Sequence, residues 1–393
     1  MSWPTVPAAE LMLKRGGSVN PANYPDETFE LLSIPAFDKG EPEIVEGKAI
    51  GSSKSCVQPN DVLLSKIVPH IKRCWVVPAP QGTYRQIGSG EWIIFRSDKI
   101  YPPFLRHFLT SEIFHKQFMN TTAGVGGSLV RARPAEVGNI EIPLPPLPEQ
   151  KRIAAILDKA DAIRRKRQQA IQLADDFLRA VFLDMFGDPR DGLKIEDMLS
   201  QKYLLLHKDG NHGSNYPAKE EFGDDGVVFI SAKDISDQDG SIDYASVAHL
   251  NESKARKLTI GWLKEGDVLL AHNATVGRVG LFSGEVDEAL IGTSLTAFRP
   301  NQERLSSVYL FAALKYSGFQ AQLKQNMGQS TRNQVPITAQ RALKIPVGDL
   351  KRQRQFERVF IKLKQVKSNL YAGLKGSDEM FSSLSQRAFS GQL

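Results

Sequence analysis

Residues 142–157 read IPLPPLPEQKRIAAIL, and this stretch decides the fold of the chain. Its prolines end any earlier helix and leave Glu149 in a first helical turn, where a carboxylate suits the helix dipole. From Glu149 to about Met185 there is no glycine or proline, and Gly187-Asp188-Pro189 follows. Apolar residues recur at a spacing of three and four, at Ile153, Leu157, Ala160, Ile163, Ala170, Ala174, Phe177, Val181 and Met185. At about 1.5 Å per residue, this predicts a helix roughly 50 Å long.

The same pattern recurs about 203 residues later, which indicates an internal repeat. In chain order the matches are Phe95-Arg96 with Phe298-Arg299, Phe108 with Phe311, Ile142-Pro143 with Ile345-Pro346, Leu147 with Leu350, Gln150 with Gln353, Asp175 with Asp378, and Phe186 with Phe389. Residues 61–64 and 267–270 both read DVLL, at a shift of 206. A second helical tail has apolar residues at Phe356, Phe360, Leu363, Val366, Leu370, Leu374, Met380, Leu384 and Ala388, and we expect Gly373 and Gly376 to weaken its middle.

Each repeat is a stretch of roughly 150 residues, rich in glycine, proline and short β-branched runs, that leads into one of these helices. Strands are expected around residues 75–77, 92–95, 227–230 and 267–270, and helices over 103–119 and 306–325. If the second helix pairs with the first, it must run back along it. The predicted fold is therefore α+β, with two mixed α/β domains joined by two long helices that form an antiparallel coiled coil with a pseudo-two-fold repeat. The alternative is a single helix-filled domain, for which 36 unbroken helical residues are long.

Composition bounds the class of protein. A chain of 393 residues exceeds one ordinary core. With only Cys56 and Cys74, the sequence excludes a disulfide framework and a four-cysteine zinc site. No apolar run reaches the roughly 20 residues of a membrane span, and no secretion signal is apparent, so a cytoplasmic location is expected. The net charge of +6 is concentrated in residues 151–167 and 351–367, which favours a polyanion partner; an acidic protein partner or a solvated helix face stays open.

The junction at residues 142–157 resembles that between the first recognition domain and the central helix in specificity subunits of type I restriction–modification enzymes. Residues 178–188, which end in MFGD, the C-terminal RAFSGQL (387–393), and residues 228–235 and 264–271 are similar to other segments of that family. One departure is Val347-Gly348-Asp349-Leu350 in place of the proline-rich second junction. The resemblance implies the domains 1–148 (first target recognition), 149–187 (central helix), 188–349 (second target recognition) and 350–393 (C-terminal helix).

The family also implies a function. Each recognition domain reads one half of a split target in double-stranded DNA, and the helices fix the separation and dock two adenine-methylating subunits, with or without two motor-nuclease subunits. S-adenosylmethionine, ATP and Mg²⁺ would then belong to those partners, and this chain would hold no cofactor or metal and catalyse nothing. The two halves are expected to differ in sequence, with an unread spacer between them. Two other classes stay open: a self-contained methyltransferase or nuclease with fused recognition domains, and a coiled-coil scaffold without a DNA role.

Three motifs resemble catalytic sites. Tyr101-Pro-Pro-Phe104 lacks the Asp or Asn that an amino-methyltransferase needs, and it fits a helix start better. In Gly124-Val-Gly-Gly127, no buried strand precedes the glycines as in a cofactor loop. The third is the pair His207 and His212, which lacks a third metal ligand at a convincing spacing and is expected to lie in a loop.

Polar loops after the predicted strands are the candidates for DNA contact, because loops on a rigid scaffold usually carry recognition. In the second domain, residues 328–334 offer Arg332 for a guanine edge and Asn333 or Gln334 for adenine. The candidates are Lys66, His70, Lys72, Arg73, Arg85, Ser128, Arg131 and Arg133 in the first domain, and Lys233, His272, Asn273, Thr275, Arg278, Gln329, Ser330, Thr331, Arg332, Asn333 and Gln334 in the second. Arg164, Arg165, Lys166, Arg167, Arg354 and Arg358 on the helices are predicted to face spacer phosphates or partner subunits, and Arg167 also falls at a seam position where it could set the register.

Overall fold

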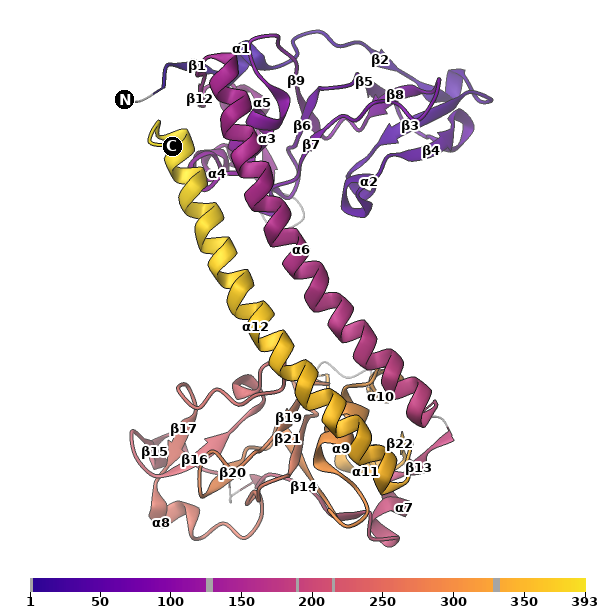
Figure 1. Ribbon diagram of the computed structural model, residues 1–393, viewed down its shortest axis with the longest axis vertical. Coiled ribbons are helices and arrows are strands. Elements are labelled where there is room, and N and C mark those ends of the chain that lie inside the picture. The colour runs from indigo at the N-terminus through magenta and orange to yellow at the C-terminus, as the bar shows by residue number, and fades with distance from the viewer. Residues whose placement is uncertain (1–2, 125–129, 189–190, 214–215, 328–332) are drawn as a thin grey trace. The chain divides into compact units, whose positions relative to one another are not determined.

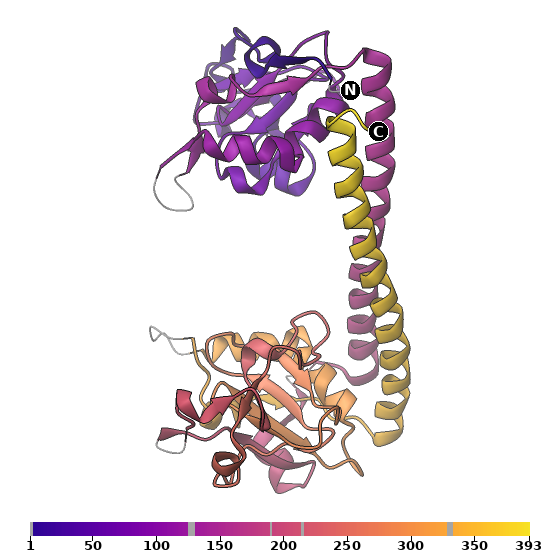
Figure 2. The same cartoon turned by 90° about the vertical axis from the view of Figure 1, so that its left-hand side faces the viewer.

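The computed structural model describes residues 3–124, 130–188, 191–213, 216–327 and 333–393. The chain forms two compact units. The first unit consists of Met1–Gln168 together with Ala372–Leu393, and the second of Gln169–Tyr371. Each unit contains one globule and a stretch of both long helices, α6 (Leu147–Phe186) and α12 (Leu350–Phe389). Figures 1 and 2 show the globule of each unit beside its own stretches of these helices.

The first unit holds a five-stranded and a three-stranded sheet. The first has the order β2 (Ser18–Val19), β5 (Lys54–Cys56), β8 (Arg85–Gly88), β3 (Thr28–Leu32), β4 (Glu43–Glu46), and the second the order β7 (Cys74–Val76), β6 (Val62–Ser65), β9 (Trp92–Phe95). The strand pairs β1 (Thr5–Pro7) with β12 (Glu141–Pro143) and β10 (Thr122–Ala123) with β11 (Arg131–Ala132) complete it. Its helices are α1 (Ala8–Leu11), α2 (Ile34–Lys39), α3 (Pro102–Thr110), α4 (Glu112–Asn120) and α5 (Pro134–Val137).

The second unit holds two four-stranded sheets. One has the order β14 (Leu204–Asp209), β21 (Leu295–Pro300), β18 (Val268–Ala271), β19 (Val279–Leu281), and the other the order β15 (Phe222–Gly223), β17 (Ala248–Leu250), β16 (Val227–Ile230), β20 (Ala289–Ile291). The pair β13 (Leu193–Lys194) with β22 (Lys344–Ile345) corresponds to β1 with β12. Its helices are α7 (Ile195–Ser200), α8 (Glu252–Ala255), α9 (Ser307–Lys315), α10 (Ser317–Gln325) and α11 (Ile337–Gln340).

Residues that match in the internal repeat occupy equivalent positions in the two units. β6 pairs with β9 so that Val62 opposes Phe95, and β18 pairs with β21 so that Val268 opposes Phe298. In both units a buried aspartate at the start of the inner strand accepts two hydrogen bonds from an arginine at the end of its neighbour: Arg96 to Asp61, both 2.6 Å, and Arg299 to Asp267, 2.8 and 2.6 Å. The two globules therefore share one scaffold.

The two junctions into the long helices are also equivalent. Gln150 is buried, accepts the Tyr101 backbone N–H at 2.7 Å and donates to the Pro145 carbonyl at 2.8 Å. Gln353 does the same with the Ser306 N–H at 2.8 Å and the Gly348 carbonyl at 2.7 Å. Each glutamine ties its helix start to the globule before it, because an unpaired buried amide would be costly.

Within each unit, α6 and α12 run antiparallel, as predicted. In the first unit Arg152 donates to the Leu393 carbonyl at 2.9 Å and Arg164 lies 3.8 Å from Asp378, so rising positions in α6 meet falling positions in α12. In the second unit Asp175 pairs with Lys367, and Phe182 packs on Phe356 with ring centroids 5.5 Å apart. Since Arg164 corresponds to Lys367 and Asp175 to Asp378, the repeat extends to these ion pairs.

Two predicted helices are in fact pairs of helices. The single helix predicted over 103–119 is wrong, because Ser111 between α3 and α4 is extended (ψ 156°) and its hydroxyl accepts the Phe114 N–H to cap α4. The helix predicted over 306–325 is divided in the same way at Tyr316, where ψ is 141°. The long helix α6 begins two residues before Glu149, since proline is tolerated in a first turn where its N–H would have no intrahelical partner.

Gly373 and Gly376, which were expected to weaken the second tail, lie inside an unbroken α12. The guanidinium of Arg167 donates to the Gly373 carbonyl and to the Ser377 hydroxyl. A Cβ at position 373 would lie 3.1 Å from the Arg167 guanidinium, so the missing side chain leaves room for this contact. The predicted seam position of Arg167 therefore joins α6 to α12 in the first unit.

Candidate nucleic-acid interface

In the second unit two predicted loops lie side by side. The segment after β18 carries His272, Asn273 and Thr275, and the segment before α11 carries Asn333 and Gln334. Asn273 and Gln334 form an antiparallel bridge, the Val335 N–H donates to the His272 carbonyl at 2.9 Å, and the Ala274 N–H donates to the Asn333 carbonyl at 3.2 Å. The backbone thus holds five of the predicted DNA-contacting residues in one place.

The first unit builds the same loop pair from the corresponding positions. Ile67 and Arg131 form the antiparallel bridge, the Ala132 N–H donates to the Lys66 carbonyl at 2.8 Å, and the Val68 N–H donates to the Val130 carbonyl at 3.2 Å. Lys66 stands where the second unit has His272, and Arg131 where it has Gln334. The frame is therefore common to both units, while the polar side chains on it differ.

A carboxylate lies between the two predicted cations of the first loop pair. Glu91 is 3.2 Å from the Arg131 guanidinium and 3.9 Å from the Lys66 ammonium, and the Arg131 side chain is 61% exposed. Such exposed ion pairs are weak, so a phosphate or a guanine edge can replace Glu91 as the partner of Arg131.

The other predicted cations of the first unit lie outside this loop pair or are held by acids. Arg73 donates twice to Asp38 at 2.7 and 2.8 Å with its side chain only 12% exposed, and this hydrogen bonding lowers the pKa of Asp38. Lys72 pairs with Glu112 at 2.5 Å, and Arg133 with Glu136 at 2.8 Å. Arg85 lies on β8 in the other sheet, 2.6 Å from Glu27 and stacked over Tyr24. His70 is exposed on a short 3-10 helix, Pro69–Ile71.

Two further candidates of the second unit, Arg278 and Lys233, are connected to its loop pair through Ala232 and Ser294. Arg278 pairs with Asp237 at 2.7 Å and donates to the Ala232 carbonyl at 3.3 Å. The neighbour of Ala232 is the exposed Lys233, and the Ala232 N–H donates at 3.2 Å to Ser294, whose carbonyl accepts the His272 N–H at 3.0 Å. Lys233 is therefore brought to the same end of the unit. Ser128, Gln329, Ser330, Thr331 and Arg332 lie outside the described residues.

His272 itself is only 1% exposed and presents no side chain to a ligand in this conformation. It ends a buried polar chain that sequence reasoning missed. His207 Nε2 lies 3.1 Å from Gln340 Oε1, Gln340 Nε2 donates to Thr296 Oγ1 at 3.0 Å, and Thr296 Oγ1 lies 2.9 Å from His272 Nδ1. The prediction that His207 lies in a loop is wrong: it is buried on β14, against the Phe298 ring.

We expect acid to destabilise the second unit through His207. Burial lowers its pKa to about 4, against 6.5 for a free histidine; nearby Arg341 and His272 also lower it, whereas Gln340 and Asp209 raise it. The unfolded chain binds the proton first, so stability present above pH 6.5 should be lost as the pH falls towards 4, by on the order of 3 kcal/mol. Denaturant titrations from pH 7 to 4 should show a flatter pH dependence for His207→Met than for the unsubstituted protein. Equal slopes for both proteins would contradict this assignment.

The predicted helix residues divide into two groups. Arg164 bonds Asp161 at 2.7 Å and lies over the Phe381 ring at 4.8 Å, and Arg167 bonds α12, so these two hold the helices together. Lys166 and Arg358 are exposed. The remaining two are near acids, Arg165 3.2 Å from Asp161 and Arg354 2.7 Å from Glu357.

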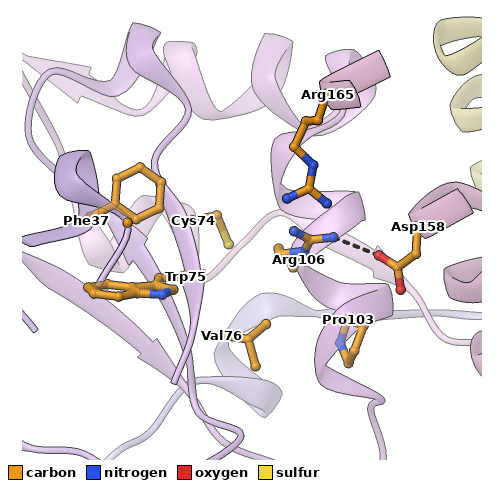
Figure 3. Close-up of a pocket in the computed structure, with 9 residues that line it drawn as sticks. Phe37, Cys74, Trp75, Val76, Pro103, Arg106, Asp158 and Arg165 are labelled. Atoms are coloured by element: carbon orange, nitrogen blue, oxygen red, sulfur yellow. Dashed lines mark hydrogen bonds and ion pairs between the residues drawn. The ribbon is translucent and has the colours of Figure 1, made fainter. Parts of the chain in front are cut away.

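Figure 3 shows Arg165 pointing into a pocket of the first unit toward Arg106, which pairs with Asp158 at 2.8 Å. Phe37, Trp75 and Cys74 line the opposite side of this pocket. Burial raises the pKa of the Cys74 thiol to about 12, so this thiol is protonated and unreactive at neutral pH.

Across the residues that the structure describes, no three His, Cys, Asp or Glu side chains gather closely enough to hold a metal ion. Over the same residues, no helix has both the length and the apolar character needed to cross a membrane.

The two units thus repeat one scaffold, with one loop pair and a stretch of both long helices in each. Residues 83–173 match the family described as "Type I restriction modification DNA specificity domain". The MjaVIII specificity subunit of Methanocaldococcus jannaschii, a type I restriction enzyme component, is 23% identical over 232 residues, which are 55% of this chain and 53% of the relative. The chain thus spans about half the length of that relative.

Two solved structures share the fold over nearly the whole chain. One, from a study of complex assembly and conformational transition in the type I R-M system, has a TM-score of 0.56 at 20% identity and covers 100% of this chain and 98% of its own. The S subunit of a type I restriction–modification system from M. genitalium has a TM-score of 0.56 at 13% identity and covers 99% and 96%. The matched segment, the curated relatives and the shared fold all indicate a type I restriction–modification specificity subunit.

Proposed function

We propose that this chain is the sequence-reading, non-catalytic subunit of a type I restriction–modification complex. It binds double-stranded DNA, reads two different short sequences separated by an unread spacer, and directs two methylating subunits to one adenine in each half. The observation that carries the proposal is the loop pair, which sits on the same backbone frame in both units with different polar side chains. A shared frame gives the two readers one mode of docking, and the different side chains give each its own sequence.

The side chains on each frame suit base and phosphate contact. Arg131 in the first unit is exposed and loosely paired, Asn333 and Gln334 in the second are exposed or half-buried, and the exposed Lys233 lies at the same end of the second unit. Arginine reads guanine by two hydrogen bonds, asparagine and glutamine read adenine in the same way, and lysine serves phosphates. The exposed helix residues Lys166 and Arg358 are candidates for spacer phosphates or the methylating subunits.

The proposal assigns the chemistry to the partners. S-adenosylmethionine would be held by the methylating subunits, and ATP and Mg²⁺ by motor-nuclease subunits where the complex has them. A self-contained methyltransferase would need a carboxylate or amide to accept from the target amine, and the motif at residues 101–104 has Tyr101 at that position, with its prolines at the start of α3.

The purified chain alone should neither methylate nor cleave DNA, nor hydrolyse ATP, and adenine methylation should appear when a methylating subunit and S-adenosylmethionine are added. Methylome sequencing of a host with and without the gene should then reveal one bipartite motif that depends on this chain. Adenine methylation by the highly purified chain alone would refute the non-catalytic assignment. A single undivided motif would refute the two-reader assignment.

A further inference from the structure

In the second unit's buried chain His207–Gln340–Thr296–His272, the first three residues have apolar counterparts in the first unit, whereas His272 corresponds to Lys66. Val137 is the last residue of α5, and Gln340, 203 positions later, is the last residue of α11. Their backbone N–H groups make equivalent hydrogen bonds, from Val137 to the Arg133 carbonyl and from Gln340 to the Pro336 carbonyl. Ile93 opposes Leu64 as Thr296 opposes Leu270. Met12 is bridged to Phe95 as His207 is paired with Phe298.

The first unit shows that this scaffold packs without the polar chain. Val137 and Ile93 are buried in its main core, and Met12 packs against that core. A buried polar chain must recover the desolvation of every group, whereas apolar residues of similar size bear no such cost. Within the described residues, the Nδ1 atom of His207 is buried without a hydrogen-bond partner, so this cost is only partly offset. The polar residues are therefore not needed to stabilise the fold.

The buried polar chain is hydrogen-bonded to both segments of the loop pair. Gln340 Nε2 donates to the Val335 carbonyl at 3.0 Å, next to Gln334 in one segment of the pair. Thr296 holds the ring of His272, whose carbonyl accepts the Val335 N–H in the other segment. A single amide thus bonds one loop segment directly and the other through Thr296. Apolar contacts would leave both segments free to shift by small distances, because dispersion contacts have no preferred angle.

We propose that Gln340 is a positioning residue for sequence recognition, and that through His207, Thr296 and His272 it holds the two loop segments of the second reader in one geometry. This inference rests on the proposed function. Gln340 touches no DNA itself; it sets where Asn273, Asn333 and Gln334 stand.

The test replaces the polar chain with the residues of the first unit, as His207→Met, Thr296→Ile and Gln340→Val together in the full-length chain. Because those residues already pack on this scaffold, we expect the variant to fold with an unfolding midpoint no lower than that of the parent protein. Hydrogen–deuterium exchange should show faster exchange at the amides of Ala274 and Val335, without any DNA present. Unchanged protection of both amides would overturn the proposal.

The DNA arm uses the full chain with its methylating subunits and duplexes that carry the motif found by methylome sequencing, with single-base changes in each half. We expect discrimination against changes in the half read by the second domain to fall about fivefold or more, the lower end of what one base pair contributes. Discrimination in the other half should stay as in the parent. An equal loss in both halves, or no loss in either, would overturn the inference.

A matched control is Gln322→Leu, which removes another glutamine of the second unit whose amide bonds a backbone, at the Lys344 carbonyl (3.1 Å) and N–H (2.9 Å), outside the loop pair. It should change stability without changing discrimination in either half; a matching loss of discrimination would show that Gln340 acts only through stability. Gln340→Leu alone should give the half-specific loss seen in the triple variant. If the parent protein directs no methylation at all, the proposed function fails. If the triple variant directs methylation with the same discrimination as the parent, only the role of Gln340 is refuted.

Discussion

Replacing Asp267 with alanine should lower the free energy of unfolding by about 3–5 kcal/mol, the usual cost of leaving one member of a buried ion pair alone. Asp267 is fully buried, receives two hydrogen bonds from Arg299 and accepts the Lys264 N–H at 2.9 Å. Without it, Arg299, which is 20% exposed, would keep its hydrogen bond to the Trp262 carbonyl at 3.1 Å and lose its carboxylate partner. Denaturant unfolding followed by circular dichroism measures the loss.

The control for Asp267→Ala is Glu288→Ala in the same unit. Glu288 pairs with Arg256 at 2.6 Å, but both side chains are close to half exposed and Arg256 also has Glu252. Exposed pairs contribute little, so Glu288→Ala should leave the unfolding midpoint unchanged. The equivalent change in the first unit, Asp61→Ala, should reproduce the large effect, since Asp61 and Arg96 repeat the buried pair. If the Asp267→Ala and Glu288→Ala variants have the same unfolding midpoint, the Asp267–Arg299 pair does not stabilise the sheet.

Lengthening the helix pair by one heptad should lengthen the preferred DNA spacer and leave both half-sequences unchanged. Because α6 and α12 run antiparallel, seven residues are needed in each, after Ala170 and after Tyr371, to keep the apolar seam. Seven helical residues add about 10 Å, the length of about three base pairs, and this sets the upper bound of the change. Methylome sequencing of cells that carry the variant and its methylating subunits gives the new spacer directly.

Insertion of the heptad after Ala170 alone is the matched control. It lengthens one helix against an unchanged antiparallel partner, so the extra residues must bulge, and methylation should fall without a defined new spacer. If the double insertion stays folded and active but keeps the original spacer, these helices do not set the separation of the two halves.

The sequence predicted the scaffold well because its signals are local or repeated. The prolines and apolar spacing around residues 142–157 placed α6 to within two residues, and the repeat carried the same prediction to α12. Gln150 and Gln353 stood out as matches, and both bond the helix start to its globule. The error over residues 103–119 and 306–325 has a physical reason: a single extended residue, Ser111 or Tyr316, divides a helix without any proline or glycine at the break.

The candidate site was predictable only in part. Two of the loops chosen because they follow predicted strands, residues 272–275 and 333–334, meet through backbone bonds, and nothing in the sequence indicated this contact. Individual side chains were not: His272 is buried, and Arg73 and Arg85 are held by Asp38 and Glu27. The sequence does not show whether an arginine faces solvent or pairs with a distant carboxylate, and the partners of Arg73 and Arg85 lie 35 and 58 positions away.

The sequence by itself determined the repeat, the two long helices and their antiparallel pairing, because periodicity and helix breakers act locally and connectivity leaves the second helix one direction in which to pair. Only the tertiary structure decided which polar residues support the second reader. The hydrogen bonds of Gln340 with His207, 133 positions away, and of Thr296 with His272, 24 positions away, join β14, β21, α11 and the loop after β18. Such bonds exist only once four separate elements have packed, since their geometry depends on distances that no single segment specifies.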